Sequence, residues 1–192
     1  MKQKTKLYLV IVYLILGLIV NVFSSNLISF INFNPPILDD LILNTIDGNY
    51  SWSMKLAEII IGFSIILFVL YAKKNKEDVI KWIFIIATFQ LIRGIMIPLT
   101  IYNPIVSSSF FSRYVTFRQG VMPSGHVSIP FLFYLFTYKK SKLQIFFLIS
   151  TFLVSLFLLL SKNHYTIDLI VAFFVCYSIK CFTEKHIFKE KC

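Results

Sequence analysis

Six apolar runs, each near the length that crosses a bilayer as a helix, constrain this 192-residue chain more than any other feature. A helix needs about 20 apolar residues to cross the hydrocarbon core. The composition agrees, because 57% of the residues are hydrophobic, 21 are phenylalanine and only 9 are acidic. The sequence therefore predicts an all-α integral membrane protein, a bundle of six transmembrane helices that forms one domain over residues 1–192. The expected spans are Leu7–Phe23, Leu56–Ala72, Val79–Leu99, Val121–Tyr138, Leu143–Leu160 and Thr166–Phe182.

The positive charges set the expected orientation of this bundle. The formal net charge is +10, and 14 of the 19 Lys and Arg residues fall on one side of the six-span arrangement. Loops rich in Lys and Arg stay in the cytoplasm, so we expect both termini there, and the charge needs no nucleic-acid partner to explain it. The 14 residues are Lys2, Lys4, Lys6, Lys73, Lys74, Lys76, Lys81, Lys139, Lys140, Lys142, Lys180, Lys185, Lys189 and Lys191.

The opposite, extracytoplasmic side receives residues 24–53, 100–120 and 161–165. The abundance of Ile, Lys, Phe and Asn is typical of an AT-rich genome, so we expect a bacterial inner membrane. Disulfides are rare in the cytoplasm, and we expect the three cysteines to be free thiols: Cys176, Cys181 and Cys192.

A histidine and an aspartate stand just before and just inside the last apolar run. His164 and Asp168 are four residues apart, which puts them on one helix face within hydrogen-bonding reach. Ionisable residues at the edge of a span are costly and indicate function. A carboxylate that holds one ring nitrogen of an imidazole fixes its tautomer and stabilises the developing cation, so His164 could attack phosphorus with Asp168 as its partner.

A second histidine opens the fourth run on the same side. His126 is the only other histidine expected on the extracytoplasmic face and could protonate a leaving oxygen. Ser124 and Gly125 precede it at an expected helix start, where amide groups and the helix dipole favour an anion. The pattern predicts a phosphoryl-transfer site.

Cationic side chains that could hold the phosphate are scarce outside the cytoplasmic set. Arg93, Arg118 and Lys162 are the main candidates, with Arg113 a further one. An arginine can hold a phosphate through two hydrogen bonds. Arg93 falls in the outer half of the third span, where an arginine is expected to be paired or to face a polar cavity.

Other interpretations of these residues stay open. A histidine at a membrane interface can be an amphipathic anchor, and two histidines with one carboxylate can form a metal-binding facial triad. A non-catalytic scaffold or transporter is a third possibility, and it does not require His126, His164 and Asp168 to converge. The shortage of further ligands favours a site without metal or cofactor.

The chain resembles the sphingomyelin synthase family, a branch of the type 2 phosphatidic acid phosphatase superfamily. The run from His164 to Ala172 is nearly a letter-for-letter match to the family's last motif, and Ser124-Gly125-His126 matches the preceding one. Pro35-Pro36-Ile37-Leu38-Asp39 is similar to the family's Pro-Pro-Leu-Pro-Asp stretch. Trp52, Glu58 and the stretch from Arg93 to Pro104 are also similar to the family's residues at these places. The resemblance implies a phosphohistidine on His164, with His126 as the acid.

The chain also departs from that family. Where the synthases have Cys-Gly-Asp before Ser-Gly-His, this chain has Arg118-Gln119-Gly120-Val121-Met122-Pro123. Pro123-Ser124-Gly125-His126 is instead the form found in the superfamily's lipid phosphatases. Lys162 stands in place of the usual arginine of the last motif. These departures bear on the acceptor of the phosphoryl group and leave two reactions open.

The resulting hypothesis is a membrane enzyme that moves a phosphoryl headgroup between lipids. A phospholipid is the expected donor and a ceramide- or diacylglycerol-like lipid the expected acceptor. If water is the acceptor, the protein is a lipid phosphatase or a phospholipase C-like hydrolase. Residues 24–53 are too apolar for a solvated loop, so we expect them to lie in the interface and partly cover the site.

Overall fold

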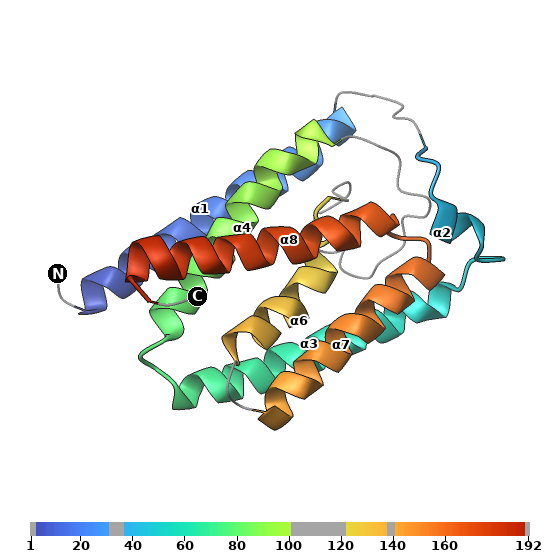
Figure 1. Cartoon of the computed structure of the whole chain (residues 1–192). Coiled ribbons are helices and arrows are strands. Elements are labelled where there is room, and N and C mark those ends of the chain that lie inside the picture. Colours follow the sequence, from blue (N-terminus) through green and yellow to red (C-terminus); the bar gives the residue numbers. More distant parts are fainter. Residues whose placement is uncertain (1–2, 31–36, 101–121, 138–140, 191–192) are drawn as a thin grey trace.

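The computed structural model describes residues 3–30, 37–100, 122–137 and 141–190. Within these ranges the chain is all-helical, as expected (Figure 1). Six helices form the bundle, with a short helix and a C-terminal π-helix beside them. The elements are α1 (Gln3–Phe30), α2 (Leu41–Asn44), α3 (Ser51–Lys74), α4 (Val79–Leu99), α6 (Gly125–Phe136), α7 (Ser141–Leu160), α8 (Thr166–Phe182) and η1 (Thr183–Phe188).

Five described helices are long and apolar enough to cross a membrane: α1, α3, α4, α7 and α8 with η1. The protein is therefore an integral membrane protein. The fourth expected span, Val121–Tyr138, is instead represented by the 12-residue helix α6. Pro123 and the helix cap at Ser124 place its start at Gly125, and Thr137 caps its other end. A helix of 12 residues is about 18 Å long, shorter than a bilayer core of about 30 Å.

Helices α1 and α4 lie side by side in Figure 1 and make the most extensive helix contact in the structure. Glycines let their backbones approach closely, as in other membrane helix pairs. A Cβ at Gly17 would lie 2.8 Å from the Ala87 carbonyl oxygen, and one at Gly94 would lie 2.9 Å from the Asn21 nitrogen. This close approach brings the polar side chains of α1 within reach of α4.

The remaining helices pack around α6, which contacts α3, α7 and α8. Stacked aromatic rings fill one part of this core, with Phe68 and Phe133 centroids 4.0 Å apart. A second cluster around Met54, Val127 and Leu169 lies under the starts of α3, α6 and α8. The start of α3 is also joined to the end of α7, because the Tyr50 N–H donates to the Leu160 carbonyl. The core thus fixes the start of α6 against the start of α8.

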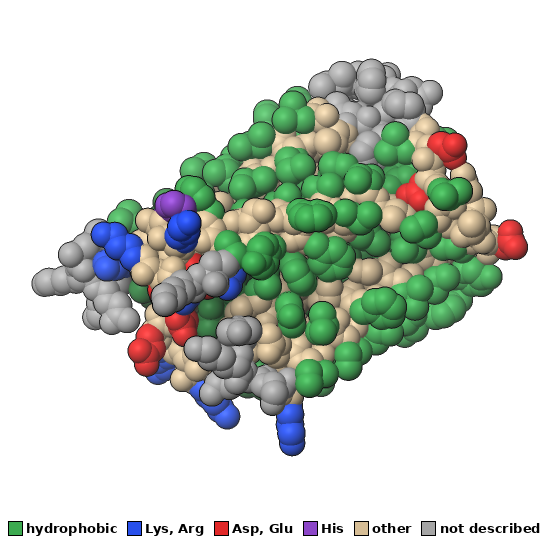
Figure 2. Space-filling model, viewed as in Figure 1, with side chains coloured by type: hydrophobic (Ala, Val, Ile, Leu, Met, Phe, Trp, Pro, Cys, Tyr) green, Lys and Arg blue, Asp and Glu red, His purple; other side chains and the backbone are tan. Residues whose placement is uncertain are grey.

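The charged side chains differ between the two ends of the bundle. On the face drawn in Figure 2, Lys and Arg gather at the end where both termini lie, and hydrophobic side chains cover the middle. At that end, Lys81 pairs with Asp78 at 3.0 Å and with Glu190 at 2.7 Å. The distribution fits a membrane protein whose basic end faces one aqueous compartment.

Cysteine chemistry differs in part from the sequence expectation. Cys176 is a buried free thiol, as expected. Cys181 is disulfide-bonded, so the expectation of three free thiols is wrong at this position.

Labelling from outside intact cells tests the predicted orientation. In a variant whose native cysteines are replaced by serine, a cysteine at exposed Asn49 should react with an impermeant thiol reagent, because this position is at the end opposite the basic residues. A cysteine at exposed Lys76 should react only after the cells are lysed. Labelling of position 76 in intact cells would reverse the orientation and put the histidines on the cytoplasmic side.

Candidate active site

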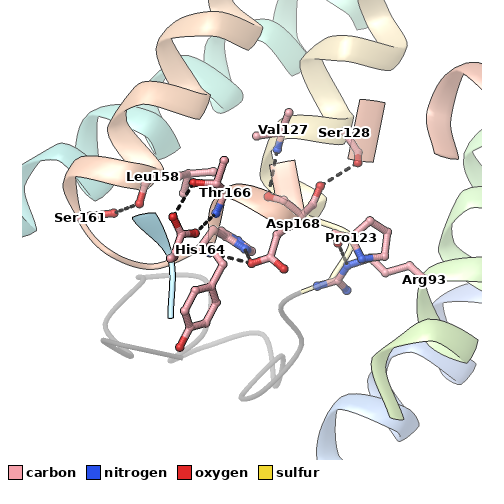
Figure 3. A network of polar contacts seen from close by, with 12 residues as sticks. Arg93, Pro123, Val127, Ser128, Leu158, Ser161, His164, Thr166 and Asp168 are labelled. Atoms are coloured by element: carbon pink, nitrogen blue, oxygen red, sulfur yellow. Dashed lines mark hydrogen bonds and ion pairs between the residues drawn. The ribbon is translucent and has the colours of Figure 1, made fainter. Parts of the chain in front are cut away.

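The site is built where the first turn of α8 meets the start of α6 (Figure 3). Asp168 is fully buried in the first turn of α8, and its Oδ2 accepts a hydrogen bond from the Tyr165 N–H at 2.8 Å. This contact is half of a capping box, which satisfies an amide at the helix start. The same oxygen lies 3.2 Å from His164 Nδ1. The predicted His164–Asp168 pair is therefore present.

The pairing fixes the chemistry of the His164 ring. The carboxylate assigns the Nδ1 proton, which leaves the Nε2 lone pair available for attack on an electrophile. His164 is 6% exposed, so little water competes for the ring. An Nδ1–H held by a buried carboxylate is also suited to stabilising the positive charge that develops during attack.

His126, in the first turn of α6, faces His164. The two ring centroids are 5.9 Å apart, and the rings meet edge to face. Two imidazoles at this separation can both reach one phosphoryl group. The convergence of His126, His164 and Asp168 is not what the scaffold or transporter interpretation requires, and it favours an enzyme.

Ser124 joins the two helix starts. Its N–H donates to the Asp168 carbonyl at 3.2 Å, and its Oγ caps α6 by accepting from the Val127 N–H. The first hydrogen bond within α6 runs from the Ser128 N–H to the Ser124 carbonyl, so Gly125 and His126 supply first-turn amides that precede the helix ladder. These amides lie at the positive end of the helix dipole, where an anion is stabilised.

Arg93 reaches this region from α4. Its Nε donates to the Pro123 carbonyl at 3.0 Å, and a Cβ at Gly125 would lie 3.4 Å from that Nε. Arg93 also interacts electrostatically with Asp168. Arg93 as a whole is 8% exposed. Its guanidinium lies beside the start of α6, as Figure 3 shows. The expectation that Arg93 is paired and faces polar groups is met.

Arg93 is held by one residue that sequence reasoning did not single out, and that residue is in turn bonded to a second. Its Nη1 donates to Asn21 Oδ1 at 2.5 Å, and Asn21 Nδ2 donates to Gln90 Oε1 at 2.5 Å. Asn21 is fully buried in α1. A polar side chain inside an apolar run was the one sequence feature that could have identified it.

None of the described contacts joins the other cationic candidates to the two histidines. Lys162 follows α7 with left-handed backbone, φ 51°, and a half-buried side chain, and none of the described hydrogen bonds or ion pairs joins it to the histidines. Arg113 and Arg118 lie outside the described residues. Among the described residues, no group of three or more His, Cys, Asp and Glu side chains could hold a metal ion. The absence of a metal requirement stays a prediction.

Residues 121–187 match the family model of the PAP2 superfamily C-terminal domain. This match supports the PAP2 superfamily. The superfamily consists in general of phosphatases and phosphotransferases, and the matched residues include His126, His164 and Asp168. No curated protein matches the chain.

The Asn21 contact can be tested through Arg93. Asn21→Leu removes the acceptor of a charged, buried hydrogen bond, which contributes about 1.5–3 kcal/mol. We expect kcat/KM on a phosphate ester to fall about 10-fold to 100-fold, because the guanidinium loses its orientation. Ser64→Ala is the control, since Ser64 is also fully buried but donates to Ile60 in its own helix. Equal activity of the two variants would show that activity does not depend on the orientation of Arg93 by Asn21.

Proposed function

We propose that this protein transfers a phosphoryl headgroup from a membrane phospholipid to the hydroxyl of a second lipid through a phosphohistidine on His164. The observation that carries the proposal is the approach of His126 to an imidazole already held by Asp168, with ring centroids 5.9 Å apart. One histidine can attack while the other handles the proton of the leaving oxygen. The PAP2 match supports lipid phosphate chemistry at this site.

The first half of the reaction forms the covalent intermediate. The Nε2 lone pair of His164 attacks phosphorus, and the bond from phosphorus to the lipid alkoxide breaks. His126 donates its proton to that alkoxide, which leaves as a neutral lipid alcohol. Asp168 stabilises the charged imidazole, while Arg93 and the first-turn amides of α6 hold the phosphoryl oxygens.

The second half regenerates the enzyme. The acceptor hydroxyl gives its proton to His126 and attacks phosphorus, and the bond to His164 breaks. A ceramide- or diacylglycerol-like acceptor yields a new phospholipid, which is the reaction that the sphingomyelin synthase resemblance implies. Ser124, Gly125, Lys162 and Arg118 are further proposed phosphate-binding residues. The proposed site faces the extracytoplasmic side of a bacterial inner membrane.

Hydrolysis is the second candidate function. Pro123-Ser124-Gly125-His126 has the form found in the lipid phosphatases of the superfamily. If water replaces the acceptor, the same two half-reactions release free phosphate or a phosphoalcohol. Transfer is ranked first because an apolar element covers the start of α8: Leu43 and Tyr165 are 2% and 1% exposed and pack together. Covering the site from water favours an alcohol acceptor.

Product analysis separates the two candidates. The purified protein is incubated with phospholipids labelled in the headgroup phosphate, with and without ceramide or diacylglycerol. Transfer should move label to a new lipid in proportion to the acceptor supplied, with no requirement for a divalent metal. Label found only in water-soluble products, whatever acceptor is present, would establish hydrolysis in place of transfer.

Leaving-group dependence tests the role of His126. His126→Ala should slow the release of a lipid alkoxide by about 10²–10⁴-fold, because a poor leaving group needs a proton in the transition state. Release of a nitrophenolate from a nitrophenyl phosphate ester should slow far less. His186→Ala is the control, since that histidine is exposed on η1. Equal slowing of both leaving groups would reassign His126 to phosphate binding.

A further inference from the structure

Asp40 bonds to two helices at once. As the cap of α2, its Oδ1 accepts from the Ile42 and Leu43 N–H groups at 3.1 and 3.2 Å. The same carboxylate also reaches the start of α8, where Oδ2 accepts from the Thr166 N–H at 2.6 Å and Oδ1 from the Thr166 hydroxyl at 3.0 Å. Asp40 and Thr166 are 126 residues apart in sequence, so this contact is tertiary.

Further contacts join the α2 segment, residues 37–50, to both catalytic motifs. The Leu38 N–H donates to the Tyr165 hydroxyl at 3.2 Å. Leu43 forms a buried cluster with Tyr165, which lies between His164 and Thr166, and Met122, which precedes Pro123, packs against this cluster. The α2 segment therefore contacts the residue next to His164, and it shares a hydrophobic cluster with a residue two positions before the Ser124 cap.

The charge of Asp40 suits this position. Desolvation alone would raise the pKa of Asp40, but the hydrogen bonds from Thr166, Leu43 and Ile42 outweigh it and bring that pKa below its usual value. The carboxylate is thus negative at neutral pH. A negative charge at a helix N-terminus is stabilised by the helix dipole, and here it also satisfies a first-turn amide of α8.

We propose that Asp40 is a positioning residue for the nucleophile: it fixes the first turn of α8 and thereby the geometry of His164 against Asp168 and His126. His164 lies two residues before Thr166, outside the helix ladder, so its position depends on how that turn is held. A displacement of about 1 Å at a reacting group can cost about 100-fold in rate. The kinetic part of this inference rests on the proposed function, and its structural part does not.

The adjacent aspartate provides a matched control. Asp39 is exposed, and its Oδ1 accepts from Asn44 Nδ2 at 2.6 Å, within the α2 segment itself. Asp39 and Asp40 variants therefore change the same charge by the same amount in neighbouring positions. Only the Asp40 variants remove the described contact with α8.

The kinetic experiment compares Asp40→Ala, Asp40→Asn and Asp39→Ala on a phosphate ester, at a temperature well below the unfolding midpoint of each. Asp40→Ala should lower kcat about 10-fold to 100-fold with KM within about threefold, because geometry is lost and binding groups are not. Asp40→Asn keeps a good helix-capping oxygen and should recover part of the rate. Asp39→Ala should match wild type. Equal kcat for Asp40→Ala and Asp39→Ala would overturn the proposal.

Hydrogen exchange tests the same contact without turnover. In Asp40→Ala, the amides of residues 164–169 should exchange faster than in wild type, while Asp39→Ala leaves them unchanged. Thr166→Val should produce a smaller increase, and Thr166→Ser, which keeps the hydroxyl, should not. If wild type turns over no lipid phosphate, the proposed function fails and exchange alone decides this inference. Unchanged exchange in Asp40→Ala would show that the carboxylate does not hold the first turn of α8.

Discussion

The carboxylate of Asp168 is the group on which the rest of the site depends. A fully buried charge is costly unless hydrogen bonds satisfy it, and here it receives the Tyr165 N–H, lies against His164 Nδ1 and interacts with the Arg93 charge. The backbone carbonyl of the same residue accepts from the Ser124 N–H. One residue thus starts α8, orients the His164 ring and joins α8 to α6. Its burial requires these partners to stay in place, and this requirement makes the site rigid.

The cationic part of the site depends on helices outside the family match. Arg93 lies in α4 and is held by Asn21 in α1, and that contact exists because Gly94 lets the two backbones approach. The chain of hydrogen bonds then passes from Arg93 to the Pro123 carbonyl, immediately before the cap of α6. The matched residues 121–187 supply the histidines and the aspartate, whereas the N-terminal half supplies the charge that faces them. The proposed phosphoryl site therefore needs both halves of the chain.

Local patterns in the sequence predict the parts of the site that a single helix builds. The four-residue spacing of His164 and Asp168 is sufficient to bring them together, because helix geometry alone fixes the distance. Ser124 is likewise predicted from the sequence as the start of a helix, and it caps α6. Asn21 and Asp40 were not found, since their partners lie far away in sequence and only the packed fold brings them close. The length of α6 was overestimated because apolar composition continues past both of its caps.

The α2 segment is held against the start of α8. In this apolar segment Asp40 is bonded to α8, and Leu43 packs with Tyr165 immediately before the start of that helix. In the proposed reaction, covering the phosphohistidine would lower the access of water at about 55 M, which would otherwise outcompete a lipid hydroxyl. The exposed side of the same segment carries Ile37 and Leu41, at 72% and 82% exposed. A segment with an apolar exposed side, bonded to the start of α8 through Asp40, suits the proposed acceptor, a lipid that would arrive from the bilayer.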